Sequence, residues 1–336
     1  MKWDFAIGNP AYQETQDATS DKPVYNYFMD EAQKIADKVE MITPARFLFN
    51  AGKTPKEWNE KKLNDEHFKV LMYESDAAKI FPNTEIKGGV TVTYRDATKK
   101  YNPIIIYTKY PELNSILHRV TQISSESISE IVYLQNKFNL EKLYESLPEV
   151  KSQIGSNGRE RRLTTSIFST TGIFFDTPNN STARILGLIK NGRVYKYIDK
   201  GYLSPHENLD KYKIVLPKVN GTGQFGETLS SPMILEPGTG FTQSFISIGA
   251  FTEKTDAVAA LNYVKSKFAR TMLNILKITQ DNNSDVWKYV PLQDFTDKSD
   301  IDWNTSIANI DKQLYKKYGL SREEIDFIET HVKEMA

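Results

Sequence analysis

Apolar and polar positions in the first hundred residues follow two different periods. Short apolar runs typical of buried strands occupy residues 3–7, 39–43, 68–73 and 90–94. Between the first two runs, apolar residues recur at helical spacing after Pro23, with Ser20 or Asp21 as a cap, and a second helix is expected near 56–66. Strands that alternate with helices predict parallel pairing through crossover helices, and therefore an α/β fold.

Beyond residue 96 the pattern changes. The middle of the chain is mostly strand-like, and Asn191-Gly192 between two apolar runs predicts a tight β-hairpin turn. Apolar residues at helical spacing predict one long helix over 255–278, and Ser321 with Glu324 forms the capping box of a final helix. We therefore expect three parts, which are a partial α/β sheet over 1–98, a mixed α+β region over 99–285 and a helical segment over 286–336.

The amino-acid composition excludes several kinds of reactive and metal-binding site. The 336 residues contain no cysteine, which excludes disulfides, thiolate metal sites and cysteine nucleophiles. The four histidines are scattered, with no pair at the spacing of metal ligands, so no metal site is expected. No apolar run approaches the roughly 18 residues of a membrane span, and the N-terminus is too short and polar for a signal peptide. A reducing cytoplasm is the expected compartment.

Charge is unevenly distributed, although the chain as a whole is neutral. Residues 1–96 carry a net charge of −3 and residues 281–336 a net charge of −5. Residues 151–225 carry 12 Lys and Arg against 5 Asp and Glu. A basic middle between acidic ends is typical of a surface that binds a polyanion, and a solvated basic surface is the alternative.

The segment Asn9-Pro10-Ala11-Tyr12 directly follows the first strand, and ligands of open α/β sheets gather at the carboxyl ends of strands. The Asn9 amide and the Pro10 carbonyl can accept two hydrogen bonds from an exocyclic amine, while Tyr12 stacks on its ring, as in a pocket for a flipped base. Acceptors around that amine favour the positive charge that develops as it attacks a methyl donor. An ordinary Asn-Pro turn is the alternative.

The residues from Trp3 to Gln13 resemble the catalytic motif of adenine-N6-specific DNA methyltransferases from type II restriction–modification systems. That motif is usually Asn-Pro-Pro-Tyr, and Ala11 here replaces the second proline. The proposed chemical groups remain after this replacement. Further similar blocks occur in the same order along the chain, at Ile42–Leu48, Phe81–Asn83, Ile86–Val90, Val290–Phe295 and Ile310–Leu314.

The resemblance implies a partial Rossmann-like methyltransferase sheet over 1–98, a DNA target-recognition domain over 99–285 and a helical tail. It implies that the Asn9 side chain and the Pro10 carbonyl hold the amine of an extruded adenine, that Tyr12 stacks on it, and that S-adenosylmethionine donates the methyl group. Only eight residues precede Asn9, whereas the cofactor-binding loop of such enzymes lies upstream. We therefore expect a partner chain to supply that half, or a truncated protein, and little activity from this chain alone.

Duplex DNA is the expected polyanion, and the target-recognition region holds the basic middle of the chain. Phosphate contacts are expected from several basic residues there, and base contacts from the arginines, which can bond guanine edges through two hydrogen bonds. A solubilising surface is the alternative. The candidate DNA-binding residues are Arg159, Arg161, Arg162, Arg193, Lys196, Lys211, Lys213 and Lys218.

Two further motifs suggest other functions. Gly221-Thr222-Gly223-Gln224-Phe225-Gly226 spells a dinucleotide-binding fingerprint, but residues 227–232 show no helical period, so we expect a plain loop or a DNA-contact loop. Asp76 with Glu85 and Lys87 has the spacing of a Mg²⁺-dependent nuclease. The alternatives to a methyltransferase component are thus a restriction nuclease and a non-enzymatic DNA-specificity module.

Overall fold

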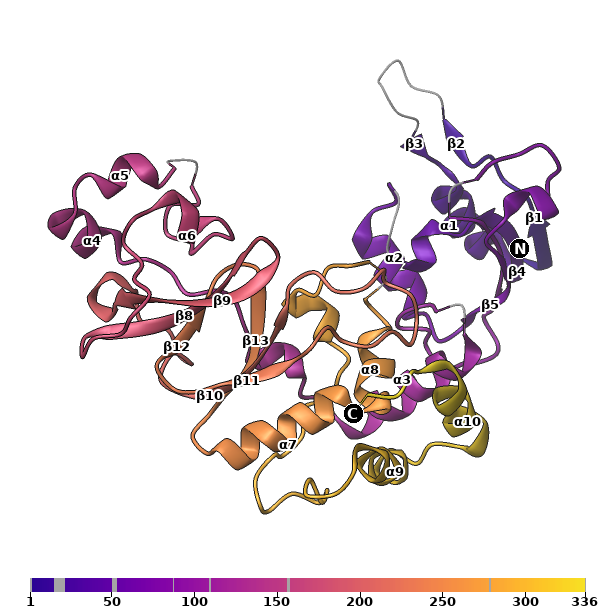
Figure 1. The fold of residues 1–336 in the computed structure, drawn as a ribbon. Coiled ribbons are helices and arrows are strands. Elements are labelled where there is room, and N and C mark those ends of the chain that lie inside the picture. Colours follow the sequence, from indigo (N-terminus) through magenta and orange to yellow (C-terminus); the bar gives the residue numbers. More distant parts are fainter. Residues whose placement is uncertain are drawn as a thin grey trace. The chain divides into compact units, whose positions relative to one another are not determined.

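The protein is described by a computed structural model that covers residues 2–14, 22–49, 53–86, 88–108, 110–155, 158–277 and 279–335 (Figure 1). The chain divides into two compact units, Met1–Asn114 and Ser115–Ala336, and each is described by itself. None of the helices in the described part of the chain combines the length and the apolar character of a membrane span.

The first unit is built on a four-stranded sheet in the order β1-β4-β6-β5. Strand β1 runs parallel to β4, and helix α1 connects the two, as predicted. The elements of this unit are β1 (Trp3–Gly8), β2 (Gln13–Glu14), β3 (Lys22–Pro23), α1 (Tyr25–Ile35), β4 (Ala36–Pro44), a 3₁₀ helix (Arg46–Phe49), α2 (Lys56–Leu63), β5 (Phe68–Glu74), a 3₁₀ helix (Ala77–Lys79) and β6 (Val90–Asp96).

The expectation of parallel strands throughout is wrong for β6, which is antiparallel to both β4 and β5. A parallel return needs a crossover, usually an α-helix. The described part of the β5–β6 connection holds only the 3₁₀ helix Ala77–Lys79, so β6 returns in the opposite direction and fills the gap between β4 and β5.

Helix α1 buries one stripe of side chains against the sheet. Tyr25, Met29 and Ala32 pack in one hydrophobic core with Val39 and Phe68. Burial of apolar surface of this kind supplies most of the stability of an amphipathic helix. Pro23 lies in β3 rather than opening the helix, which begins at Tyr25, and the expected caps Ser20 and Asp21 lie outside the described residues.

The second unit contains a four-stranded sheet in the order β11-β10-β13-β7 and a three-stranded sheet in the order β12-β8-β9. The predicted hairpin is confirmed, because β8 and β9 pair antiparallel. The register pairs Ile189 with Gly192, so the central residues of the turn are Lys190 and Asn191, with positive φ angles of 50° and 64°, rather than the predicted Asn191 and Gly192. The strands are β7 (Val132–Tyr133), β8 (Thr182–Ile189), β9 (Gly192–Asp199), β10 (Tyr212–Pro217), β11 (Met233–Leu235), β12 (Thr239–Phe241) and β13 (Phe245–Phe251).

The described chain beyond residue 110 also contains α-helices. Helix α3 begins just before the division between the two units. These helices are α3 (Pro111–Ile123), α4 (Leu140–Ser146), α5 (Val150–Gln153), α6 (Ile167–Thr170), α7 (Lys254–Lys265), α8 (Lys267–Leu273), α9 (Ile307–Lys317) and α10 (Arg322–His331). The predicted capping box is confirmed, because the Ser321 and Glu324 side chains each bond the other's main-chain N–H at the start of α10.

The single helix predicted over 255–278 is wrong, because Ser266 separates α7 from α8. The Ser266 hydroxyl accepts a hydrogen bond from the Ala269 main chain at 3.1 Å. The Asp311 carboxylate accepts two more, from the Lys267 and Phe268 main chains at 3.1 and 2.9 Å. Burial raises the pKa of Asp311 to about 6. These acceptors satisfy the first N–H groups of α8, so the helix can restart there.

Candidate functional site

The Asn-Pro turn lies where two parallel strands end. Strand β1 pairs with β4 in a register that places Gly8 opposite Met41, so the residues that follow each strand emerge at the same edge of the sheet. On the β4 side these residues are Ala45 and Arg46, and the antiparallel strand β6 begins at this edge, with Val90 opposite Pro44. Three chain segments therefore meet at the edge where ligands of α/β sheets bind.

A cleft of about 820 Å³ opens at this edge. Binding clefts for small organic ligands have volumes of this order. Ala11, the residue that departs from the family motif, is not among the lining residues. The cleft is lined by Asn9, Pro10, Tyr12, Gln13, Pro23, Tyr25, Pro44, Arg46, Lys53, Thr84, Glu85 and Ile86.

Two polar groups of the turn have no hydrogen-bond partner among the residues that the structure describes. The exposed Asn9 side chain makes no hydrogen bond to any described residue. The Tyr12 hydroxyl is buried without a partner among the described residues, and burial raises the pKa of Tyr12. The Tyr12 carbonyl accepts from the Val24 main chain at 3.2 Å, which ties the turn to the start of α1. A fixed turn with free acceptors is suited to hold a hydrogen-bond donor.

Several lining residues carried no signal of their own in the sequence. Tyr25 is buried, and its ring forms a wall of the cleft. Desolvation raises the pKa of Tyr25 to about 12, so its hydroxyl stays neutral. Arg46 lies in the block 42–48 that resembles the methyltransferase family, but that block alone gave it no role. The rule that parallel strands end at one edge would have placed Arg46 at the same edge as Asn9, once the pairing of β1 with β4 was known.

The three arginines of the polar segment before Leu163 are all exposed. Arg159, Arg161 and Arg162 make no ion pair with any described residue. The main chain of Arg161 accepts from Phe138 at 2.7 Å, and Arg162 pairs with Lys137 in an isolated β-bridge. The backbone of this segment is therefore anchored while its guanidinium groups face solvent.

The other basic residues named from the sequence are largely occupied by protein partners. Arg193 donates to the Ser231 carbonyl at 2.8 Å and stacks over Phe245. Lys196 pairs with Asp176, and Lys211 donates to the Thr252 hydroxyl at 2.9 Å.

Lys218 is half-buried and makes no ion pair with a described residue. The prediction that Lys213 contacts DNA is corrected, because the Lys213 side chain is buried. The Lys213 ammonium donates to the Leu209 and Thr239 carbonyls, and desolvation lowers the pKa of Lys213 to about 7. It is therefore an internal hydrogen-bond donor rather than a surface cation.

The glycine-rich motif at 221–226 is a loop that no helix follows, as predicted. The Glu227 carboxylate accepts hydrogen bonds from the main chains of Thr222 and Gly223, which lowers the pKa of Glu227 against the effect of its partial burial. Gly226 lies against the tail, because a Cβ there would be 2.0 Å from the His331 carbonyl. The groups that would bind a pyrophosphate are thus already satisfied within the chain.

The carboxylates considered for a nuclease do not assemble into a described metal site. Asp76 caps the 3₁₀ helix Ala77–Lys79 by accepting from the Ala78 main chain at 3.1 Å. Glu85 lines the cleft, and Lys87 lies outside the described residues. Across the residues that the structure covers, no group of three or more His, Asp or Glu could hold a metal ion.

Comparison with known proteins gives a family match over the part of the chain that contains the Asn-Pro turn. Residues 1–81 match the Eco57I restriction-modification methylase family. The chain is also 32% identical over 95 residues to an uncharacterised adenine-specific methylase of Mycoplasma pneumoniae, a match that covers 27% of this chain and 22% of the relative. These findings confirm the predicted resemblance to adenine methyltransferases of restriction–modification systems. The aligned part of the chain spans less than a quarter of that relative's length.

A solved structure of the type IIL restriction-modification enzyme MmeI, in complex with DNA, is also similar. That likeness covers 98% of this chain and 56% of MmeI, with 9% identity and a TM-score of 0.37.

Proposed function

We propose that this chain is a component of a DNA adenine-N6 methyltransferase and that its first unit binds the target adenine. The observation that carries the proposal is the cleft at the end of β1, into which the Asn9 turn presents hydrogen-bond acceptors that no described residue uses. The family match over residues 1–81 supports the same function.

The chemistry of the turn suits an extruded adenine. The Asn9 side-chain oxygen and the Pro10 carbonyl accept the two hydrogens of the exocyclic amine, and the Tyr12 ring stacks on the purine. Acceptors fixed before the reaction stabilise the positive charge that develops on the amine nitrogen, without reorganisation at that moment. A base taken out of the duplex is required, because stacked and paired adenine does not present its amine to such a cleft.

The described residues do not fit S-adenosylmethionine as a complete site. The glycine-rich loop at 221–226 is filled by Glu227, and the cleft at the end of β1 is the site proposed for the adenine. S-adenosylmethionine supplies the methyl group in this family, so residues outside this sequence would hold it, on the same polypeptide or on a partner chain.

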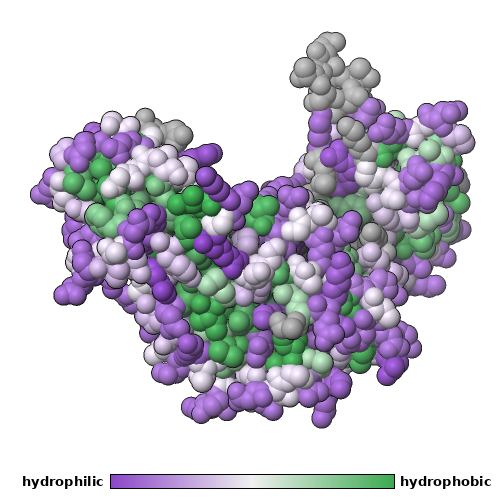
Figure 2. All heavy atoms as spheres, viewed as in Figure 1, coloured by the Kyte–Doolittle hydropathy of each residue, from purple (hydrophilic) through white to green (hydrophobic). Residues whose placement is uncertain are grey.

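Strand β1 is where we propose that this cofactor-binding half docks. It is an edge strand of the described sheet, and its Trp3, Phe5 and Ile7 side chains are 67%, 44% and 76% exposed. Figure 2 shows apolar surface interspersed with polar side chains around β1 and β4. An exposed apolar edge strand is uncommon in a protein that works alone, because it invites pairing with another strand.

The second unit is proposed to hold the DNA duplex. The exposed guanidinium groups of Arg159, Arg161 and Arg162 are available for phosphates or guanine edges, unlike the internally paired basic residues of the same region.

The test of this function is an Asn9→Ala substitution. The chain is combined with the polypeptide that carries the cofactor-binding half, and methyl transfer from labelled S-adenosylmethionine to DNA is measured. Loss of one fixed acceptor is expected to lower the rate on the order of a hundredfold, with duplex affinity and melting temperature unchanged because Asn9 is exposed.

The matched control is Asn102→Ala, which removes an exposed asparagine of the same unit that does not line the cleft. Full activity of the Asn9 variant would remove the proposed role of the turn. Sequence-specific DNA binding without any methyl transfer would instead identify a non-enzymatic specificity module.

A further inference from the structure

Arg46 occupies a fixed position on the wall of the cleft. Strand β4 ends at Pro44, and the Ala45 main chain donates to the Gly89 carbonyl at 3.0 Å. Arg46 then opens a 3₁₀ helix whose next two side chains, Phe47 and Leu48, are fully buried. The backbone that carries Arg46 is therefore held from both sides.

Packing against a glycine also restricts the side chain of Arg46. Gly88 has a φ angle of +88°, and a Cβ built on it would lie 2.5 Å from the Cγ atom of Arg46. The aliphatic stem of Arg46 thus runs directly over Gly88, in space that only glycine leaves open. This contact fixes the lower part of the side chain, while the residue as a whole remains exposed and lines the cleft.

The guanidinium group of Arg46 has no partner in the described part of the chain. No ion pair or hydrogen bond joins it to a described residue, whereas Arg95 in the same unit pairs with Asp65 at 2.7 Å. An unpaired guanidinium whose stem is already positioned loses little freedom when it binds an anion, and its planar donors match a phosphate.

We propose that Arg46 binds a backbone phosphate of the nucleotide whose adenine occupies the cleft. The inference rests on the proposed function, and it adds a positioning residue that recognises the sugar-phosphate part of the extruded nucleotide rather than its base. Asn9 and Arg46 follow neighbouring parallel strands, so one cleft presents acceptors to the amine and a donor to the phosphate.

The carboxylate of S-adenosylmethionine is a second source of an oxyanion, and the sheet order argues against it. The cofactor-binding half is proposed to join at the free edge of β1, whereas Arg46 follows β4, the inner neighbour of β1. Arg46 therefore lies on the inner side of Asn9, away from the edge proposed for the cofactor-binding half.

The experiment compares four small ligands on the full chain at low salt, by isothermal titration or ligand-detected NMR. Deoxyadenosine, deoxycytidine, deoxyadenosine 3′,5′-bisphosphate and S-adenosylhomocysteine are titrated separately. We expect the bisphosphate to bind about tenfold more tightly than deoxyadenosine, because one charge-assisted contact forms, and we expect added salt to reduce this difference.

Arg46→Ala and Arg46→Gln should abolish the preference for the bisphosphate and leave deoxyadenosine affinity unchanged, while Arg46→Lys should retain part of the preference. Lys61→Ala is the matched control, because Lys61 is an exposed cation of the same unit outside the cleft. Asn9→Ala should weaken both adenine ligands by the same factor. The melting temperature of each variant checks that it remains folded.

Failure of this inference and failure of the proposed function give different results. If Arg46→Ala keeps the bisphosphate preference while adenine binding still depends on Asn9, the role of Arg46 is wrong and the proposed function stands. If the unaltered chain binds deoxyadenosine no better than deoxycytidine, the proposed function is wrong and the role of Arg46 falls with it. A loss of affinity confined to S-adenosylhomocysteine would assign Arg46 to the cofactor carboxylate and overturn the inference.

Discussion

Two turns of this protein each resemble a ligand-binding motif in sequence and differ in what surrounds them. The turn at Asn9–Tyr12 and the loop at Gly221–Gly226 each follow a strand and each spell a motif that binds nucleotides in other proteins. In the first, the Asn9 side chain has no partner in the described chain and lines a cleft. In the second, the Glu227 carboxylate accepts a hydrogen bond from the main chain of the loop, and the C-terminal tail fills the space beside Gly226.

This difference shows that a binding motif is recognised by polar groups that have no hydrogen-bond partner within the protein, rather than by the order of its residue types alone. A buried or fixed polar group with no internal partner costs free energy unless a ligand or water completes it. The Gly221–Gly226 loop has already recovered that free energy from its own chain. Substitutions in the two turns should therefore act on different measurements, on ligand binding for the first and on folding for the second.

The largest effect is expected from Gly226→Ala. The new methyl group would collide with the His331 carbonyl in a backbone conformation that glycine favours, since φ is +80°. We expect a loss of about 3 kcal/mol in the free energy of unfolding, measured by urea denaturation. Gly238→Ala is the control, because Gly238 also has a positive φ but nothing lies near its Cβ, so about 1 kcal/mol is expected there. Equal losses in the two variants would mean that the tail contact does not matter.

A smaller effect, confined to binding, is expected from Tyr12→Ala. Removing an aromatic ring that stacks on a base costs about 2 kcal/mol, which is roughly a thirtyfold loss of deoxyadenosine affinity. Tyr12→Phe should bind normally, because the Tyr12 hydroxyl has no partner among the described residues and stacking needs only the ring. Weak binding by the Phe variant would show that the hydroxyl contacts the ligand directly.

The smallest effect is a pH dependence that separates an internal cation from a surface cation. The folded pKa of Lys213 is about 7, whereas the unfolded side chain titrates near 10.5. Between these values the unfolded state binds more protons, so raising the pH from 7 to 9 stabilises the fold, by on the order of 1 kcal/mol per pH unit at most. Lys213→Met should flatten this rise in the melting temperature, whereas Arg161→Ala should leave it unchanged. An unaltered rise in the Lys213 variant would assign it to another group.

Much of the local structure could be predicted from the sequence because short-range interactions decide it. The β8–β9 hairpin follows from the turn signal around Asn191, although its central residues are Lys190 and Asn191 rather than Asn191 and Gly192. The start of α10 follows from the Ser321 and Glu324 capping box. The position of Asn9 after a strand was equally readable from the apolar run before it. Each of these signals lies within a few residues of the feature that it predicts.

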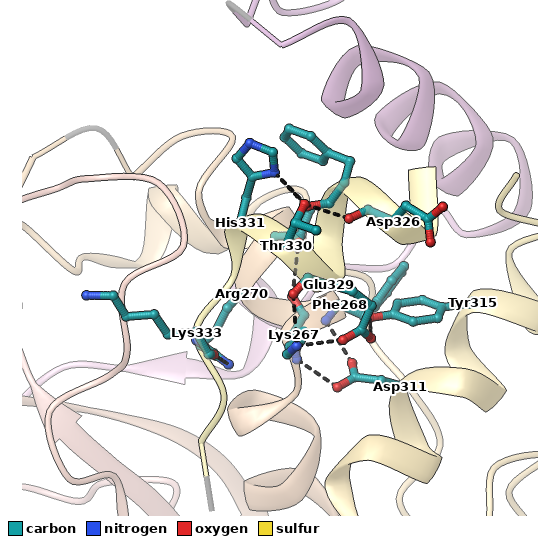
Figure 3. Close-up of polar contacts among 12 residues, drawn as sticks. Lys267, Phe268, Arg270, Asp311, Tyr315, Asp326, Glu329, Thr330, His331 and Lys333 are labelled. Atoms are coloured by element: carbon teal, nitrogen blue, oxygen red, sulfur yellow. Dashed lines mark hydrogen bonds and ion pairs between the residues drawn. The ribbon is translucent and has the colours of Figure 1, made fainter. Parts of the chain in front are cut away.

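The errors arose where a distant residue intervened. Helical spacing continues from α7 into α8, but Asp311, which lies more than forty residues away, accepts from the Lys267 and Phe268 main chains and lets the helix restart at Ser266 (Figure 3). Lys213 looked like a surface cation because its charge is visible in the sequence, while the carbonyls that hold it are contributed by Leu209 and Thr239. The antiparallel direction of β6 likewise depends on pairing with two other strands.

The sequence by itself determined the strand before Asn9, the chemical groups of the turn and the family that residues 1–81 resemble. Only the tertiary structure decided that these groups line a cleft, that Arg46 lies on the same wall, and that the glycine-rich loop is closed by Glu227. The physical reason is that residue type fixes which hydrogen bonds a group can make. Which of them remain free for a ligand depends on the segments that fold against it.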